Sequence, residues 1–438
     1  MIIKKGRNVI WSTKRIRNFI YQGGEMDMSY VKKLKCLLCG TEYDSNEVKY
    51  NCPKCGDEGV LEVIYDYSRI KNEFNRKSLE RNKEFSMWRY LPLLPVDDPV
   101  KIGPSKVGWT PLYEAKRIRE DLGMLNLWIK DDGRNPTASL KDRPSAIAVV
   151  KARELGEKII TCASTGNAAS SLAGAAASVG LKSYIFVPQT APIAKIAQLL
   201  VFGSTVFAVK GTYDEAFDLS IEATREFGWY NRNTAFNPYM VEGKKTVALE
   251  IIEQMDFEVP DYLFVPVGDG CIISGVAKAY KDMFFLGLID HLPKLVAVQA
   301  EGCKPIVEAV NGDGTVKFVE PNTIADSIAV GIPRNRLMAV RDIKESKGFG
   351  IAVSDKEILE AIKYLGTKQG IFAEPAGSTA FAGMVKTLKE GKISKGDKIV
   401  VLVTGNGLKD VESAKKAGGE ALVINPNLEA VKETMNQK

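Results

Sequence analysis

The stretch NPTASLKDR, at residues 135–143, joins a strand-like run at residues 125–130 to a helical pattern that begins near Ser139. It therefore places Lys141 at the start of a predicted helix. A helix N-terminus disfavours an added positive charge, and burial disfavours an ammonium group further, so both effects favour the neutral amine. A neutral amine is a nucleophile that forms a Schiff base with an aldehyde. The stretch predicts a reactive lysine where a strand gives way to a helix.

The chain has 438 residues, of which 45% are hydrophobic, so it is long enough to form two sizeable units. No run of about 18 or more apolar residues occurs, which argues against a membrane span. The net charge is +6, but nine of the 60 Lys and Arg residues and two of the 54 Asp and Glu residues lie in residues 1–35. That leaves 51 basic and 52 acidic residues, so the body has no basic excess for binding nucleic acid.

The chain has seven cysteines, four of them in two Cys-x-x-Cys pairs, and one histidine, His291. This cysteine content in a long chain indicates a reducing compartment, and we expect the cytoplasm. A single histidine argues against a Ser-His-Asp triad and against a histidine-rich catalytic metal site. We therefore expect the acid–base chemistry to come from a lysine with an organic cofactor.

Residues 1–30 are basic, poor in acidic residues and interspersed with apolar residues. This composition is compatible with a transit peptide or with a helix that binds a membrane surface or a partner. We favour a loose extension, because chain ends are commonly unstructured. Met28 is an alternative start, since it opens directly onto the next module.

That module contains the pairs Cys36/Cys39 and Cys52/Cys55, separated by twelve residues, with a glycine after each pair. Two such knuckles bring four thiolates to one tetrahedral point, which is the geometry of closed structural Zn²⁺ sites. The metal then has no open position for substrate, so we expect a structural zinc ribbon at residues 31–66 that supports folding. Some zinc ribbons bind nucleic acid, but a structural clip is the better interpretation here.

Residues 67–107 are charged and then proline-rich, and we expect a connecting arm there. Beyond them, short apolar runs rich in β-branched residues alternate with helical stretches. The runs lie at residues 158–162, 183–187, 205–209, 262–267, 295–299 and 399–403. This alternation predicts an α/β fold with parallel sheets covered by helices on both faces.

In open α/β sheets, ligands bind beyond the C-terminal ends of the strands, so the turns after these runs are candidate sites. The turn at residues 164–167 opens a helix of small residues and is either an anion pocket or a plain helix cap. The turn at residues 268–272 has closely spaced glycines, which let successive amides converge on a phosphate. A third turn, TGNGLKD, occupies residues 404–410.

The lysine stretch and the third turn resemble signatures of threonine synthases, which belong to the fold type II enzymes that use pyridoxal 5'-phosphate (PLP). Residues 135–143 resemble their Asn-Pro-Thr-x-Ser-Phe-Lys-Asp-Arg signature, and residues 404–410 resemble their Thr-Gly-x-Gly-x-Lys-Asp segment. Fold type II dehydratases usually carry a Ser-Gly-Gly-Asn segment at the latter position. The resemblance covers about residues 36–415. In some threonine synthases and cysteate synthases, a ribbon with cysteine pairs also precedes the catalytic body.

The resemblance implies a fold type II PLP enzyme, similar to the tryptophan synthase β subunit, with two parallel-sheet α/β domains and a small N-terminal zinc ribbon. We expect a large PLP-binding domain at residues 108–144 and 235–438. A smaller α/β domain is expected at residues 145–234. The family also implies a homodimer and a small amino-acid substrate.

By the same resemblance, Lys141 is the catalytic lysine and Thr404 meets the pyridine nitrogen. The turn at residues 164–167 holds the substrate carboxylate, with its asparagine facing the cofactor ring oxygen, and the glycine turn cups the cofactor phosphate. The implied cofactor-binding residues are Lys141, Asn167, Gly268, Asp269, Gly270, Cys271, Ile272 and Thr404. The candidate substrate-binding residues are Ser164, Thr165, Gly166, Lys244 and Lys245.

The turn at residues 234–240 departs from the family pattern. Threonine synthases tend to read Asn-Ser-x-Asn-Pro-x-Arg there, whereas this chain has Thr234, Ala235 and Met240 in place of the residues that grip the substrate phosphate. Losing a charge-assisted contact to a phosphate costs about 1.5–3 kcal/mol. We expect Arg232, Lys244 or Lys245 to compensate, with assistance from the amides of a helix that begins at residues 243–246.

The implied reaction converts O-phosphohomoserine and water into threonine and phosphate, with Lys141 acting as the general base. Met240 keeps open an alternative within the same chemistry, which is β-elimination or β-replacement on serine, threonine or O-phosphoserine, as in dehydratases or cysteate synthases. A remote alternative is a non-catalytic binding protein in which the zinc ribbon contacts nucleic acid.

Overall fold

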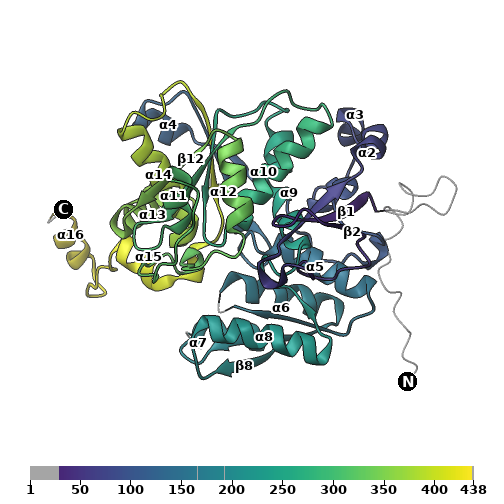
Figure 1. Cartoon of the computed structure of the whole chain (residues 1–438). Coiled ribbons are helices and arrows are strands. Elements are labelled where there is room, and N and C mark those ends of the chain that lie inside the picture. Colours follow the sequence, from purple (N-terminus) through teal and green to yellow (C-terminus); the bar gives the residue numbers. More distant parts are fainter. Residues whose placement is uncertain (1–28, 165, 192, 437–438) are drawn as a thin grey trace, which may run out of the picture.

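The structure is a computed structural model that describes residues 29–164, 166–191 and 193–436. The predictions for residues 1–28 and for Thr165 lie outside these residues. Within the described part of the chain, three β-sheets organise the fold, with helices packed around the two larger ones (Figure 1).

The largest sheet has six strands in the order β12-β11-β10-β13-β5-β4. Its strands are β4 (Leu112–Glu114), β5 (Asn126–Asp131), β10 (Tyr262–Pro266), β11 (Lys294–Ala300), β12 (Phe349–Val353) and β13 (Lys398–Val403). All neighbouring pairs are parallel except β4 with β5. Because β5 and β13 are parallel neighbours, the turns that follow them leave the sheet at the same edge.

Residues on the strands of this sheet alternate between two hydrophobic layers. On β10, Leu263 and Val265 belong to the core shared with α9 (Tyr239–Gln254) and α10 (Cys271–Phe285). Phe264 between them belongs to the core shared with α13 (Asp355–Gln369) and α14 (Pro375–Lys389). Both faces are therefore covered, as expected for parallel strands with few polar residues.

The second sheet has four parallel strands in the order β8-β7-β6-β9. They are β6 (Ile159–Ala163), β7 (Lys182–Pro188), β8 (Thr205–Val209) and β9 (Tyr230–Asn231). The helices α5 (Asp142–Glu154), α6 (Asn167–Val179), α7 (Ile193–Val201) and α8 (Tyr213–Phe227) accompany this sheet in the lower part of Figure 1. Helix α5 also packs against α9 of the larger unit, so the two units share a core.

The third sheet is small and antiparallel, in the order β2-β1-β3. It comprises β1 (Val31–Cys36), β2 (Glu42–Tyr43) and β3 (Leu61–Tyr65). Cys36 ends β1, and Cys39, Cys52 and Cys55 lie in the segments that connect the three strands. Residues 67–107 follow with α2 (Tyr67–Glu73), α3 (Arg76–Arg81) and the 3₁₀ segments η2 (Met87–Leu93) and η3 (Pro99–Lys101). Tyr90 and Leu94 of this segment are fully buried, so it packs into the main core.

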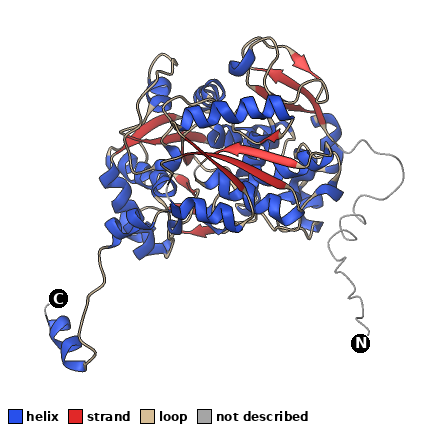
Figure 2. Cartoon of the chain, turned by 90° about the horizontal axis from the view of Figure 1, so that it is seen from below, coloured by secondary structure: helices blue, strands red, loops and turns tan. Residues whose placement is uncertain are grey.

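Five further helices lie in the larger unit or at the C-terminal end of the chain. They are α4 (Lys116–Leu122), α11 (Pro305–Asn311), α12 (Arg336–Glu345), α15 (Val411–Gly418) and α16 (Leu428–Asn436). Figure 2 shows α16 set apart from the body at the end of an extended segment. Within the described ranges, we find no helix with the length and apolar character that crossing a bilayer requires.

The apolar runs predicted as strands are confirmed, since each lies on one of β6, β7, β8, β10, β11 or β13. The antiparallel strand β4 was not predicted, and neither were β9 and β12. The helix expected to begin at residues 243–246 begins earlier, at Tyr239, with Pro238 as its cap residue. The amides of residues 243–246 therefore lie in the second turn of α9, where they bond within the helix and cannot assist a phosphate.

Candidate active site

The turn that carries Lys141 connects β5 to α5 along the edge of the large sheet. Lys141 is the cap residue of α5, one position before its first residue, Asp142. The N–H of Leu140 donates to the carbonyl of Thr404 at 2.9 Å, and the N–H of Asn406 donates to the carbonyl of Ala138 at 3.0 Å. The lysine turn and the turn after β13 are therefore joined by backbone hydrogen bonds, which brings Lys141 and Thr404 together.

Asp142 fixes the conformation of this turn from within. Its carboxylate accepts the Thr137 hydroxyl at 2.7 Å and the Thr137 N–H at 2.8 Å. These bonds span the left-handed Ala138, whose φ is +67°. Burial raises the pKa of Asp142 to about 6. A non-glycine residue at such a φ costs about 1 kcal/mol or more and persists only where its surroundings hold it.

A fully buried ion-pair network lies beneath the turn. Arg143 donates to Asp132 at 2.7 and 2.8 Å and to Glu250 of α9 at 2.5 and 2.8 Å. The ammonium of Lys130 donates to the same Glu250 at 2.7 Å, and the N–H of Trp109 donates to it at 2.7 Å. Because every charge in the network has an opposite partner, it ties β5, α5 and α9 together. The final arginine of NPTASLKDR therefore anchors the turn instead of facing a ligand.

Lys141 lines a cavity with about 390 Å³ of space between its walls. The glycine turn at residues 266–272 forms one wall, Thr234 and Lys244 form another, and residues 327–330 close the third side. Burial, and then the positive charges of Lys244 and Arg232, lower the pKa of Lys141 to about 8. This cavity therefore favours a neutral amine far more than solvent does.

The glycine turn leads directly into α10, which begins at Cys271. Gly270 has a φ of +91°, and a Cβ there would lie 2.6 Å from the Cβ of Ala339, so a side chain does not fit. The Asp269 carboxylate accepts the N–H of Arg334 at 3.2 Å. The first amides of α10 have no partner within the helix and can bind an anion.

These features fit PLP, which carries an aldehyde and a phosphate dianion. The cavity combines an amine of lowered pKa with the N-terminus of a fifteen-residue helix. Lys141 would hold the aldehyde carbon, and Gly268, Asp269, Gly270, Cys271 and Ile272 would surround the phosphate.

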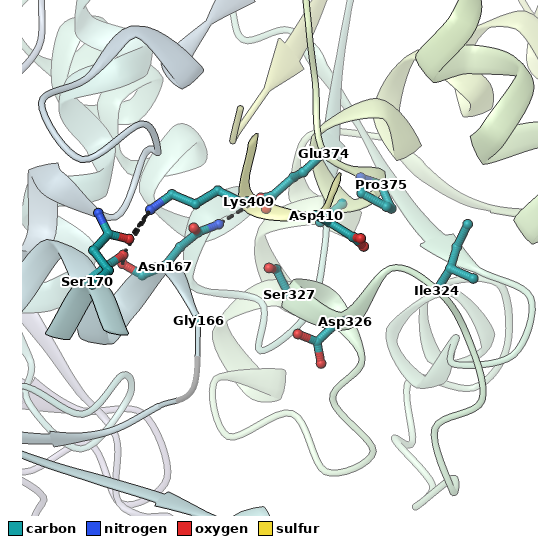
Figure 3. Close-up of a pocket in the computed structure, with 12 residues that line it drawn as sticks. Gly166, Asn167, Ser170, Ile324, Asp326, Ser327, Glu374, Pro375, Lys409 and Asp410 are labelled. Carbon is teal, nitrogen blue, oxygen red and sulfur yellow. Dashed lines mark hydrogen bonds between the residues drawn. The ribbon is translucent and has the colours of Figure 1, made fainter. Parts of the chain in front are cut away.

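Asn167 and Glu374 face each other in a second space (Figure 3). Asn167 is the first residue of α6, and its side-chain amide donates to the Glu374 carboxylate at 2.7 Å. The N–H of Glu374 donates to the carbonyl of Gly405 at 3.1 Å, which places this acid next to the Thr404 turn. The sequence analysis did not identify Glu374, although a Glu-Pro pair before a helix of small residues is the available signal.

The same space, of about 420 Å³, includes Gly166 of the predicted carboxylate turn. The Ser164 hydroxyl accepts the N–H of Gly166 at 3.2 Å. Lys409, from the turn after β13, reaches across to Ser170 at 3.2 Å and to Gln198 at 3.1 Å (Figure 3). This space therefore links the small-residue helix α6 with the C-terminal turn.

Two buried cations converge on the Thr234 hydroxyl. The Lys244 ammonium donates to it at 3.2 Å and the Arg232 guanidinium lies within 3.5 Å of it. Arg232 also donates to Ser145 at 3.3 Å, and its Nη2 has no hydrogen-bond partner. The two residues are only 1% and 2% exposed, and no carboxylate of the described chain pairs with either.

Lys245 and Met240 lie elsewhere. The Lys245 ammonium is already paired with Glu242 at 2.6 Å and with Asp282 at 2.7 Å, and it does not line the cavity. Met240 is fully buried in the hydrophobic core. Of the three cations considered for the substrate phosphate, the structure therefore brings together Arg232 and Lys244.

Among the described residues, the four cysteines around the small sheet form the only group of side chains that could hold a metal ion. Their sulfur atoms all lie within 4.8 Å of one another, with 3.9 Å between Cys36 and Cys55 and 3.7 Å between Cys39 and Cys52. Four sulfurs at about 2.3 Å from a tetrahedral Zn²⁺ are roughly 3.8 Å apart. The donor set and its spacing therefore fit zinc.

Residues 104–405 match the family model described as pyridoxal-phosphate dependent enzyme. This chain belongs to that family. It is 41% identical to the threonine synthase of Methanocaldococcus jannaschii over 406 residues, which cover 92% of this chain and 99% of that protein. It is 39% identical to the threonine synthase of Methanosarcina acetivorans, over 92% of this chain and 98% of the relative.

Solved structures of PLP-dependent enzymes share the fold. The processed form of threonine deaminase isoform 2 from Solanum lycopersicum aligns with a TM-score of 0.61 and 25% identity, over 71% of this chain and 83% of that chain. Maize serine racemase aligns with a TM-score of 0.60 and 23% identity, over 75% of this chain and 92% of that chain. The predicted fold type II architecture is confirmed, and the chain is a PLP-dependent lyase of the threonine synthase type.

Proposed function

We propose that this enzyme converts O-phosphohomoserine and water into threonine and phosphate. The observation that carries the proposal is the pair of buried cations, Arg232 and Lys244, beside Lys141. Burial lowers the pKa of both groups, and among the described residues neither has a carboxylate at ion-pair distance, so an anionic ligand is the partner that would stabilise their charged forms. The threonine synthases of the two archaeal relatives support the same substrate.

The substrate phosphate is assigned to Arg232 and Lys244 together. Arg232 donates to Thr234 and Ser145, and its Nη2 has no hydrogen-bond partner, so that nitrogen remains available. Lys244 interacts with both the Thr234 hydroxyl and the Cys271 thiol, so it lies between the substrate turn and the glycine turn. We therefore assign the cofactor phosphate to the amides of the glycine turn and the second phosphate to Arg232, with Lys244 shared between them.

When bound, PLP supplies an electron sink that makes the protons of a substrate amino acid acidic at Cα. Lys141 is proposed to remove and return protons at the substrate carbons, because a pKa of about 8 keeps its amine ready for both steps near neutral pH. Arg232 and Lys244 are proposed to hold the phosphate and to stabilise its negative charge as it leaves. Asn167, with its partner Glu374, and Thr404 are proposed to orient the cofactor ring.

Three further features belong to this proposal. The ribbon cysteines Cys36, Cys39, Cys52 and Cys55 are proposed to hold one structural zinc ion. The enzyme is proposed to work as a homodimer in the cytoplasm. Ser164, Thr165 and Gly166 are proposed to bind the substrate carboxylate.

The deciding experiment compares substrates with one enzyme preparation. Phosphate release from O-phosphohomoserine is measured beside keto-acid release from serine, threonine and O-phosphoserine. We expect phosphate and threonine in equal amounts from O-phosphohomoserine. If that compound yields no phosphate while serine or O-phosphoserine yields a keto acid, the enzyme is a β-eliminating one and the proposal is wrong.

A further inference from the structure

The turn that holds Thr234 has a strained backbone that needs support from outside. Ala235, the next residue, has a φ of +64° although it is not glycine. Such a residue persists only where neighbouring groups hold it in place. Because the Thr234 hydroxyl is the common acceptor of Lys244 and Arg232, a small displacement of the turn would disturb both cations.

The first cysteine knuckle of the ribbon supports this turn on one side. Leu37, which directly follows the ligand Cys36, packs with Val60 against a small hydrophobic cluster that contains Ala235 and Cys271. The N–H of Leu37 donates to the carbonyl of Val60 at 3.0 Å, which joins the two ribbon residues. The cluster therefore connects the knuckle with the substrate turn and with the glycine turn.

The approach to the second knuckle supports the turn on the other side. Tyr50 stacks on Phe236, with ring centroids 4.4 Å apart and an interplanar angle of 21°. Its hydroxyl accepts the N–H of Asn231 at 2.8 Å and donates to the carbonyl of Trp229 at 3.3 Å. Tyr50 therefore binds the chain on both sides of Arg232 and Thr234, at residues 229–231 and at residue 236.

We propose that the cysteine ribbon positions the phosphate-binding turn, and that Leu37 and Tyr50 are positioning residues for the substrate phosphate. This inference rests on the proposed function. No residue of the ribbon lines the Lys141 cavity or the Asn167 space. The ribbon packs instead behind the turns that carry Ala235 and Cys271, so its contribution is to phosphate binding more than to the chemical step. Binding energy that places a phosphate depends on exact geometry, and a displacement of about 1 Å is costly.

The test compares two adjacent residues of one knuckle. Leu37→Ala removes packing against the cluster that contains Ala235, whereas Leu38→Ala changes a side chain that is 50% exposed and lies between the same two cysteines. For each purified holoenzyme we would measure zinc content, cofactor absorbance, KM and kcat with O-phosphohomoserine, and the Kd of inorganic phosphate by calorimetry. Leu37→Met, which conserves volume, serves as the rescue variant.

We expect Leu37→Ala to raise KM and the phosphate Kd by roughly three- to tenfold, with kcat within about twofold and with zinc and PLP retained. Leu38→Ala and Leu37→Met should behave as wild type. Unchanged KM and phosphate Kd in Leu37→Ala would overturn the inference, and so would an equal loss with Leu38→Ala. If Leu37→Ala loses its zinc, Tyr50→Leu makes the same test from the other side of the turn, and an unchanged phosphate Kd in that variant would overturn the inference.

The two proposals fail in different ways. If wild type binds inorganic phosphate but does not turn over O-phosphohomoserine, the proposed function is wrong, while the effect of Leu37→Ala on the phosphate Kd still decides the positioning role. If O-phosphohomoserine is the substrate and Leu37→Ala has no effect, only the positioning role is wrong.

Discussion

Lys244→Met should make Lys141 more basic and slow the attachment of the cofactor at neutral pH. Burial lowers the pKa of Lys141 most, and the positive charge of Lys244 has the next largest effect; the resulting pKa is about 8. At pH 7 an amine with this pKa is roughly 9% neutral, whereas an ordinary lysine is roughly 0.04% neutral. A like charge within about 4–6 Å typically accounts for at least a tenfold change in that fraction.

The assay follows the rate at which cofactor-free protein regains PLP absorbance as a function of pH. Since only the neutral amine reacts, the rate should rise with pH and level off above a midpoint near 8 in the wild type. Lys244→Met should move this midpoint upward and reduce the rate at pH 7 by about tenfold, while the two proteins converge above about pH 10.

Lys244→Arg is the matched control, because it keeps the positive charge and should leave the midpoint in place. PLP itself titrates in this range, but it does so equally for all three proteins, so a difference between them reports on Lys141. A midpoint that is the same in wild type and Lys244→Met would refute the assignment of Lys244 as a cause of the lowered pKa.

Three other changes test the remaining parts of the site. Lys141→Ala should abolish turnover and the lysine-linked absorbance without altering the circular dichroism spectrum, and retention of both signals would show that another residue holds the cofactor. Cys52→Ser should reduce bound zinc from about one ion per chain to much less, as measured by metal analysis; wild-type protein with intact thiols and no zinc would contradict the ribbon assignment. Glu250→Gln leaves Arg143 and Lys130 with too little negative charge and should cost about 3–5 kcal/mol of stability in urea unfolding, whereas Glu258→Gln at the exposed Lys398 ion pair should change it little.

The Glu250 network also predicts an acid dependence of stability. Arg143 and Lys130 hold the pKa of Glu250 at about 2, well below its ordinary value. Because the folded-state pKa is depressed, the stabilisation is present above the unfolded value of about 4.3 and is lost as the pH falls towards 2. In Glu250→Gln this part of the acid dependence should disappear.

Much of the fold followed from periodicity, because each buried strand of a parallel sheet is a short apolar run with strong β propensity. Two of the strands that periodicity missed, β4 and β9, lack that signal. Strand β9 has only two residues, Tyr230 and Asn231, and β4 pairs antiparallel at the sheet edge. Their place depends on the neighbouring strands that they meet, which a local pattern does not contain.

The lysine turn was predictable for a different reason. A strand followed by a lysine and a helix is a local arrangement, so the position of Lys141 at the start of α5 follows from the sequence pattern, and the sign of its pKa change follows mainly from burial. By contrast, the pairing of Asn167 with Glu374 joins residues that are 207 positions apart. No spacing rule relates them, so Glu374 emerged only when α6 and α14 were placed beside the same turn.

The substrate turn shows how a missing residue can be replaced by another at helical spacing. Position 240 and position 244 are four residues apart on α9, so they lie on the same side of the helix, one turn from each other. A helical side chain leans towards the N-terminus of its own helix and covers the preceding turn. The Lys244 side chain reaches the Thr234 hydroxyl, whereas Met240 is buried in the hydrophobic core. We therefore propose that Lys244 supplies, from the next turn of α9, the positive charge that the resembled family carries at position 240. From the sequence, Lys245 was as good a candidate as Lys244. One residue further along the helix is a rotation of about 100°, and that rotation directs Lys245 to Glu242 and Asp282 instead.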